Sequence, residues 1–227
     1  MNKYSIEFFA NRLLRNTDKE FFQPLIDIMF GVCPEMMSRK IPEANIQQAF
    51  TLYCLQKTIN QNSKILCVGS FEDTSYEFLK LGQYNIYGID PSINFDLHTF
   101  STNSLEKYDI IFSTSVIEHV KNDDEFIEDI CKLLIPGGLA ILTCDFKEEY
   151  KKGDPLPNTD IRFYTEYDLK TRLSDIVLKN NCELISESNW KGEPDFLYQG
   201  HYYSFATLVF KRKENIFIAM SNILEIE

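Results

Sequence analysis

The first sixty residues have a helical pattern of apolar positions. The pattern is clearest over residues 43–61, where Ile46, Phe50 and Tyr53 recur at a spacing of three or four. Pro42 precedes this stretch, and proline is favoured in the first turn of a helix. We therefore expect a helical N-terminal region that lies outside the sheet described next.

From there onwards, short apolar runs alternate with stretches of helical periodicity. Runs of four or five residues that are apolar on both faces are typical of strands in a parallel sheet covered by helices on both sides. This alternation predicts an α/β fold with a doubly wound, parallel sheet. The expected strands are 65–69, 86–90, 110–114 and 139–143, and the expected helices lie around 76–81 and 126–134.

Further along the chain the order of the elements changes. A polar stretch with two prolines predicts a loop over 147–159, followed by a helix over 165–180. Two apolar runs, 183–188 and 203–211, are separated by too few residues for a helical crossover. They predict an antiparallel strand pair at the edge of the sheet. The last residues, 214–227, predict a terminal helix.

Charge and composition narrow the range of partners. The chain has 34 acidic and 23 basic residues, a net charge of −11, which disfavours binding to nucleic acid. No apolar run approaches the ~18–20 residues of a membrane span, and the N-terminus lacks a signal-peptide core. The six cysteines form no C-x-x-C pair, so neither a disulfide framework nor a metal site is indicated. We expect one cytoplasmic domain over 1–227, with a helical cap over 1–62, a core over 63–213 and the terminal helix, and no nucleic-acid or membrane partner.

Two residues follow neighbouring strands, at the edge where an open parallel sheet binds its ligand. Gly69 ends the first strand, and Asp90 ends the second about twenty residues later. A glycine lets the backbone approach a ligand, and a carboxylate accepts hydrogen bonds from both hydroxyls of a ribose. The pair predicts a site for an adenosine-type ligand, although a turn glycine and a solvated acid would also fit.

Two further motifs complete the pattern. S-V-I-E-H-V at 115–120 follows the strand at 110–114, and L-L-I-P-G-G at 133–138 leads into the strand at 139–143. With the glycine loop and the strand-end acid, these motifs resemble those of the class I S-adenosylmethionine-dependent methyltransferases over residues 64–211. The resemblance implies a Rossmann-like, mostly parallel seven-stranded sheet with a C-terminal antiparallel pair, and S-adenosylmethionine as cofactor. It assigns cofactor binding to residues in the loops after three strands: Gly69, Ser70, Glu72, Asp90, Pro91, Ser115 and Val116.

The first loop departs from the pattern of this family. Cys67 stands where an acid usually precedes the glycine, and Phe71 and Asp73 replace two later glycines. Phe71 would obstruct a pyrophosphate, which argues against a dinucleotide cofactor. Ser70 and Glu72 could contact the amino-acid part of S-adenosylmethionine, or Glu72 could simply favour the start of the next helix.

The segment after Asp90 is unusually short. Only 18 residues separate Asp90 from Asp109, so the helix and strand normally found in this family at that place must be shortened. Residues 95–100 are the one remaining strand candidate. The residue that contacts adenine is therefore not assigned from the sequence.

His119 is the first candidate for acid–base chemistry. An imidazole suits removal of a proton from an acceptor hydroxyl, and His119 follows the strand at 110–114, beside the expected place of the cofactor's methyl group. His119 could instead be structural, capping the following helix or packing against Pro136. Asp145 is a second catalytic candidate, and His201 is a third.

Aromatic and basic residues in the later loops could form the wall that binds the acceptor. Aromatic rings beside cations suit a sugar that carries a phosphate or a nucleotide. Each of these residues could also be purely structural, and the only tryptophan could be a core anchor. The expected substrate-binding residues are Arg162, Tyr164, Trp190, His201 and Tyr202, with Lys151 and Lys152 nearby.

These observations predict a methyltransferase for a small-molecule acceptor. Our leading hypothesis is O-methylation of a sugar or nucleotide-linked sugar in surface-glycan synthesis. One alternative is methylation of another small metabolite at oxygen or nitrogen. The other is a noncatalytic partner or regulatory protein that retains the fold, because the atypical first loop could bind the cofactor poorly. The oligomeric state is not predicted.

Overall fold

The computed structural model describes residues 4–157 and 160–214. Its N-terminal region is helical, as the apolar pattern predicts. The α-helices of this region are α1 (Lys19–Val32), α2 (Pro34–Arg39) and α3 (Asn45–Thr58). Short 3₁₀ turns lie between and before them, at Ile6–Phe8, Asn16–Asp18 and Pro42–Ala44.

The four parallel strands are those that the apolar runs predict. In chain order they are β2 (Ile65–Val68), β3 (Ile86–Ile89), β4 (Tyr108–Thr114) and β5 (Leu134–Phe146). They lie in the order β3-β2-β4-β5. The pairing of β4 with β5 shifts register at the start of β5, where the run 135–138 bulges out of the ladder.

Strand β8 (His201–Arg212) extends the sheet antiparallel to β5, and β6 (Cys182–Leu184) pairs antiparallel with β8. This arrangement confirms the predicted antiparallel pair. Two short strands, β1 (Leu13–Leu14) and β7 (Phe196–Tyr198), also pair with β8. Within residues 4–157 and 160–214 the sheet therefore has eight strands instead of the expected seven. The expectation that the first sixty residues lie wholly outside the sheet is wrong for β1.

The segment between β3 and β4 contains a helix where we expected a strand. Helix α5 spans Leu97–Asn103, and the Asp96 side chain caps it by accepting a hydrogen bond from the Thr99 amide at 2.9 Å. The prediction of a strand over 95–100 is therefore wrong, because local capping favours a helix in this short segment. Strand β3 consequently ends the sheet on this side.

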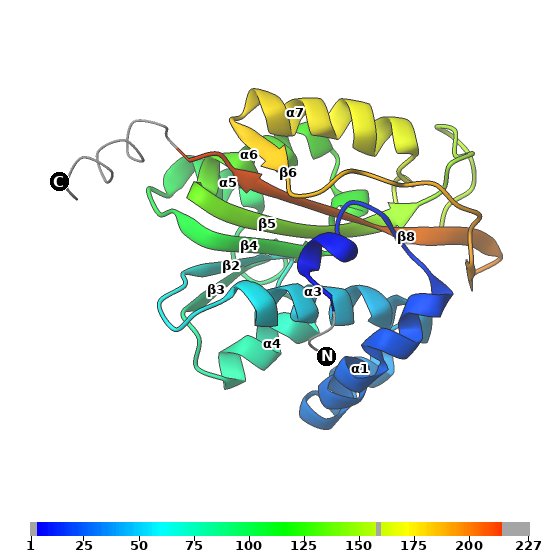
Figure 1. Cartoon of the computed structure of the whole chain (residues 1–227), viewed down its shortest axis with the longest axis horizontal. Coiled ribbons are helices and arrows are strands. Elements are labelled where there is room, and N and C mark those ends of the chain that lie inside the picture. The colour runs from blue at the N-terminus through cyan, green and yellow to red at the C-terminus, as the bar shows by residue number, and fades with distance from the viewer. Residues whose placement is uncertain (1–3, 158–159, 215–227) are drawn as a thin grey trace.

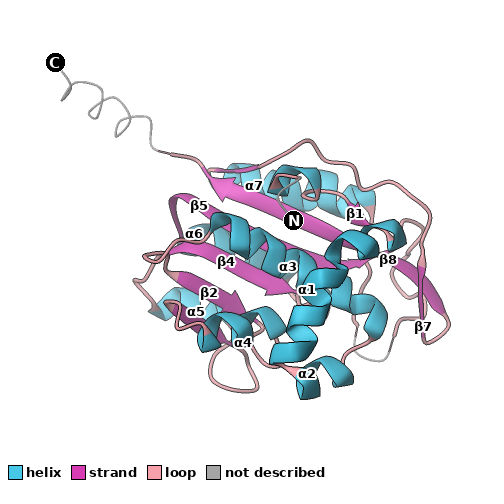
Figure 2. Cartoon of the chain, turned by 60° about the horizontal axis from the view of Figure 1, so that its bottom comes forward, coloured by secondary structure: helices cyan, strands magenta, loops and turns pink. Residues whose placement is uncertain are grey.

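Helices cover both faces of the sheet (Figures 1 and 2). Helices α3 and α4 (Thr74–Leu81) lie on one face, with α1 packed outside α3. The other face carries α5, α6 (Asp123–Leu133) and α7 (Ser174–Lys179), the last preceded by a π-helical run at Asp168–Leu173. The hydrophobic core on the α3 face joins residues of the cap to residues of the sheet, including Phe22, Phe50, Ile65 and Phe112.

The described helices and strands do not test two of the predictions, the terminal helix and the single domain. The helix expected over 214–227 lies outside the described residues, apart from Glu214. The assignment of the chain to one domain stays a prediction. Within the described ranges, no helix is both long enough and apolar enough to cross a membrane.

Candidate active site

A cavity of about 1150 Å³ opens at the carboxyl ends of β2, β3 and β4. Val68 pairs with Ile89 in the sheet, so Gly69 and Asp90 leave their strands side by side. The volume has room for a nucleoside-sized ligand and an acceptor beside it. All but Ser70 of the residues expected to bind the cofactor line this cavity: Gly69, Glu72, Asp90, Pro91, Ser115 and Val116.

The loop after β2 lies tightly against the loop after β4. Gly69 has a φ angle of +83°, a conformation that glycine adopts more easily than other residues. A Cβ atom at Gly69 would lie 2.3 Å from the Cγ2 atom of Val116. A side chain at this position would therefore displace Val116 and narrow the cavity, which explains the glycine.

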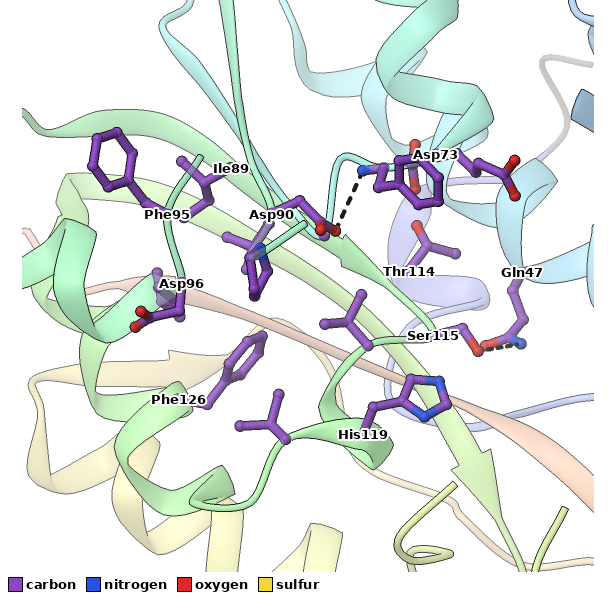
Figure 3. Close-up of a pocket in the computed structure, with 18 of the residues that line it drawn as sticks. Gln47, Asp73, Ile89, Asp90, Phe95, Asp96, Thr114, Ser115, His119 and Phe126 are labelled. Atoms are coloured by element: carbon purple, nitrogen blue, oxygen red, sulfur yellow. Dashed lines mark hydrogen bonds between the residues drawn. The ribbon is translucent and has the colours of Figure 1, made fainter. Parts of the chain in front are cut away.

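The Asp90 carboxylate keeps capacity for a ligand. Its Oδ1 atom accepts hydrogen bonds from the amide and the hydroxyl of Ser92, at 2.8 and 2.5 Å. Its Oδ2 atom accepts one from the Phe71 amide at 3.4 Å (Figure 3). Because an ionised carboxylate has about four lone-pair sites, Oδ2 can accept a further hydrogen bond from a ribose hydroxyl. This geometry fits the predicted role of Asp90.

Glu72 ties the first loop to the N-terminal cap. It has a φ angle of +57°, which is uncommon for a residue other than glycine. Its Oε1 atom accepts two hydrogen bonds from the Arg39 guanidinium, at 2.7 and 3.0 Å. The neighbouring Asp73 accepts a hydrogen bond from the Tyr76 amide at 2.8 Å and caps α4. Asp73, and not Glu72, is therefore the acid that starts this helix.

Ser70 lies outside the cavity, in contrast to the prediction. It is only 4% exposed, and a Cβ atom at Gly88 would lie 2.7 Å from its Oγ atom. Ser70 therefore packs closely against β3 and faces a smaller neighbouring pocket. Contact with a ligand in the main cavity would require a change of the loop.

Helix α3 contributes polar groups that the sequence analysis did not single out. The Gln47 amide donates a hydrogen bond to the Ser115 hydroxyl at 3.4 Å, and Gln48 accepts one from the Thr74 amide at 3.2 Å. Both glutamines line the cavity although they are almost fully buried. The sequence does contain a signal for this site, because polar residues recur on a helix that is otherwise apolar. In the structure four of them are buried: Asn45, Gln47, Gln48 and Thr51.

On the far side of Asp90, apolar side chains line the cavity beside polar ones such as Asp96 and His98, and we call this part the apolar end. Figure 3 shows Phe95 and Asp96 on one side of Asp90, and Gln47 with Ser115 on the other. Leu97 and Phe126 also line the cavity, and both are almost fully buried. Apolar side chains with a few polar groups at their edge suit a planar heterocycle.

His119 lies in the cavity wall, in the 3₁₀ turn Ile117–His119 that follows β4 (Figure 3). Its Nδ1 atom is 3.5 Å from the Oδ1 atom of Asp160, whose side chain is 5% exposed. A buried carboxylate orients an imidazole and stabilises its protonated form. The two side chains can therefore receive a proton from a group in the cavity.

Two further carboxyl groups lie close to His119 and Asp160. Glu118 is fully buried, and its Oε1 atom accepts a hydrogen bond from the Ser115 hydroxyl at 2.6 Å. Burial raises the pKa of Glu118 to about 7, although the field of His119 opposes this rise. Burial and the negative fields of Glu118 and Asp160 raise the pKa of Asp145 well above its ordinary value.

Asp145, the second catalytic candidate, does not line the cavity. It is 6% exposed at the end of β5 and lies behind the wall that His119 forms. This region is acidic but does not have the geometry of a metal centre. Across residues 4–157 and 160–214, no group of three or more His, Cys, Asp or Glu side chains is arranged to hold a metal ion.

Arg162 is engaged in structural contacts. Its guanidinium lies 2.6 Å from the Asp123 carboxylate and donates hydrogen bonds to the carbonyls of Val120 and Lys121, at 2.7 and 2.9 Å. Although burial opposes ionisation of Asp123, Arg172 and Arg162 hold its pKa below the usual range. Arg162 therefore fixes the loop that carries Asp160 against the turn that carries His119, and it does not line the cavity.

The other predicted substrate residues also lie away from the cavity. The Tyr164 hydroxyl lies 2.9 Å from the Asp123 carboxylate, and Tyr164 is fully buried. Trp190 is 1% exposed and donates a hydrogen bond to the Thr207 carbonyl at 2.8 Å, as a core anchor would. His201 and the exposed Tyr202 lie in the β7–β8 hairpin. The structure does not bring these four side chains together at the cavity that holds His119.

Comparison with known proteins identifies a family for this chain. Residues 38–184, well over half of the chain, match the family model described as "Methyltransferase domain". A search among curated protein sequences finds no significant match.

Solved structures share the fold at low sequence identity. The [4+2]-cyclase SpnF is 14% identical with a TM-score of 0.53, and the match covers 76% of this chain and 81% of that one. A SAM-dependent methyltransferase from Methanosarcina mazei is 12% identical with a TM-score of 0.51, covering 71% of this chain and 97% of that one. At such identities the likeness shows the fold alone.

The fold and the family match define the class of this protein. The chain belongs to the methyltransferase-domain family and has the Rossmann-like fold of class I S-adenosylmethionine-dependent methyltransferases. It is an S-adenosylmethionine-dependent methyltransferase, and S-adenosylmethionine is its cofactor. The cavity residues fit this cofactor, because the constrained Gly69 and the available Asp90 oxygen stand at adjacent strand ends.

Proposed function

We propose that this methyltransferase transfers a methyl group to a hydroxyl oxygen of a small acceptor, with a sugar as the acceptor class. The observation that carries the proposal is the pairing of His119 in the cavity wall with the buried Asp160. A hydroxyl must lose its proton as it attacks, and a histidine held by a carboxylate is a suitable general base.

The orientation of the cofactor in this proposal follows from the two ends of the cavity. The adenine would lie at the apolar end near Leu97 and Phe126, with the ribose at Asp90. The amino-acid part would then lie towards Gly69 and Gln47. In this orientation the sulfonium faces the side of the cavity that His119 lines. The bound cofactor supplies the electrophilic methyl group.

Residues around His119 have supporting roles in this reaction. His119 accepts the hydroxyl proton, and Asp160 stabilises the imidazolium that forms. Glu118 accepts a hydrogen bond from the Ser115 hydroxyl, and this bond holds the start of the turn. The Ile161 amide donates a hydrogen bond to the Glu118 carbonyl at 3.2 Å, which helps to keep Asp160 in place.

The charges near His119 support an uncharged acceptor over a phosphorylated one. The Asp160 carboxylate behind His119 makes this side of the cavity unfavourable for a phosphate. Arg162, the cation expected to bind a phosphate, is occupied by Asp123 and two carbonyls. A free sugar therefore fits better than a nucleotide-linked sugar. A role in surface-glycan synthesis and a cytoplasmic location remain predictions from the sequence.

A panel of acceptors tests this proposal. Purified protein with labelled S-adenosylmethionine is assayed against free sugars, nucleotide-linked sugars and small amines. We expect methyl transfer to a sugar hydroxyl, with a rate that falls by roughly 10² to 10⁴ in His119→Ala and with nearly unchanged cofactor affinity. His201→Ala is the matched control, because His201 lies outside the cavity, and it should retain full turnover.

Three results would contradict the proposal. Activity confined to amines would point to N-methylation, and activity confined to nucleotide-linked sugars would show that the charge argument fails. Full turnover in His119→Ala would remove the histidine from the mechanism.

A further inference from the structure

Lys40 is a lysine at the cavity that the reaction described above does not use. It directly follows α2 as its C-cap residue, and it lines the cavity together with Gln48 and Asp73. In the described part of the chain, its ammonium makes no hydrogen bond and no ion pair, and it is substantially desolvated. A cation that is withdrawn from water without a partner is costly unless a ligand compensates it.

The acids nearest to Lys40 are already engaged by other groups. Glu72 is held by two hydrogen bonds from Arg39. Asp73 accepts hydrogen bonds from the Tyr76 amide at 2.8 Å and from the Gln48 side chain at 3.4 Å. These contacts leave the Lys40 ammonium available to an anion in the cavity.

The position of Lys40 indicates which part of a ligand it can reach. Asp73, whose field acts on Lys40, lies with Thr114 on the opposite side of Asp90 from Phe95 and Asp96 (Figure 3). This is the end that the proposed orientation gives to the amino-acid part of the cofactor. The carboxylate is the only anionic group of S-adenosylmethionine.

We propose that Lys40 binds the carboxylate of S-adenosylmethionine and makes the cavity selective for nucleosides that carry this group. The inference rests on the cofactor orientation proposed above. It gives the N-terminal cap a direct part in cofactor recognition: Lys40, directly after α2, supplies the cation, while Arg39, the last residue of α2, holds the acidic first loop in place.

If Lys40 binds the carboxylate, the affinity for S-adenosylmethionine should depend on pH. Burial lowers the pKa of the Lys40 ammonium, while Asp73 and Glu72 oppose the fall. A bound carboxylate favours the charged amine, so cofactor affinity should fall as the pH rises through this lowered pKa. The fall should be present in the unaltered protein and absent in a variant without the amine.

Calorimetric titration with two ligands tests the inference. The ligands are S-adenosylmethionine and its decarboxylated form, which lacks only the carboxylate. The unaltered protein should bind S-adenosylmethionine about 10- to 100-fold more tightly than the decarboxylated form. Lys40→Met should abolish this preference by weakening the first ligand alone, and Lys40→Arg should restore part of it.

Lys121→Met is the matched control, because Lys121 lines the same cavity on the His119 side and should not affect the preference. If Lys40→Met does not fold, the unaltered protein provides the test: its preference for S-adenosylmethionine over the decarboxylated form should be lost at alkaline pH. A preference that survives in Lys40→Met, or that is constant with pH in the unaltered protein, overturns the role of Lys40 alone. Failure of the unaltered protein to bind either ligand overturns the cofactor site and this inference together.

Discussion

Replacing Glu118 by glutamine should make the protein more stable at pH 8 and change its stability much less at pH 5. Glu118 is fully buried, and burial raises its pKa from 4.5 to about 7. The folded protein therefore holds a proton on Glu118 that the unfolded chain releases above pH 4.5. Such a group destabilises the fold as the pH rises through the window from about 4.5 to 7.

The size of the effect follows from this difference. The difference between a pKa of 4.5 in the unfolded chain and about 7 in the folded protein, at about 1.4 kcal/mol for each pH unit, corresponds to about 3 kcal/mol at pH 8. The amide introduced by Glu118→Gln would stay neutral at every pH, and its oxygen could still accept the hydrogen bond from the Ser115 hydroxyl. The free energy of unfolding of Glu118→Gln should therefore exceed that of the unaltered protein by about 3 kcal/mol at pH 8.

Urea unfolding at pH 5, 6, 7 and 8 measures this difference. The fluorescence of Trp190, the only tryptophan and a buried one, reports unfolding. Glu128→Gln is the matched control, because Glu128 is exposed on α6 and the effect of its replacement should not change with pH. A difference between Glu118→Gln and the unaltered protein that is the same at pH 5 and pH 8 would refute the reasoning.

Three further changes separate structural from functional residues. Arg162→Ala should lower the free energy of unfolding by about 2 to 3 kcal/mol, because it removes one of the two cations paired with Asp123 and the donor to the carbonyls of Val120 and Lys121, while calorimetry should show unchanged cofactor affinity. Gly69→Ala should weaken cofactor binding at least about tenfold in the same assay, because its Cβ atom would displace Val116. Trp190→Phe should lower the free energy of unfolding by about 1 kcal/mol or more through loss of the hydrogen bond to a β8 carbonyl, followed by circular dichroism because the variant has no tryptophan. An effect of Trp190→Phe on the KM of the acceptor would show that the indole does more than fill the core.

The site residues at the strand ends could be predicted from the sequence, because the short apolar runs that mark the strands are local features. Gly69 and Asp90 each follow a short apolar run, and parallel strands bring their carboxyl ends to one edge of the sheet. The resemblance of the motif around His119 to the family placed that residue near the cavity as well. These features need no knowledge of distant contacts.

The remaining features depend on contacts between distant segments. Lys40 and Gln47 reach the cavity only because the cap packs onto the sheet, which no local pattern shows. Arg162 looked free to bind a phosphate, but its partner Asp123 lies far earlier in the chain, at the start of α6, and no local pattern pairs the two residues. The two-residue strand β1 is too short to leave a periodic signal.

The most direct test of the account is a calorimetric titration of the unaltered protein and of Asp90→Ala with S-adenosylmethionine. The account predicts binding to the unaltered protein and a loss of about 1.5 to 3 kcal/mol in Asp90→Ala, the worth of hydrogen bonds to a charged group. Asp27→Ala, which removes an exposed acid from α1, should bind as the unaltered protein does. No heat of binding from the unaltered protein at millimolar cofactor, or equal affinity in Asp90→Ala, would contradict the central claim that the cofactor lies at the ends of β2 and β3.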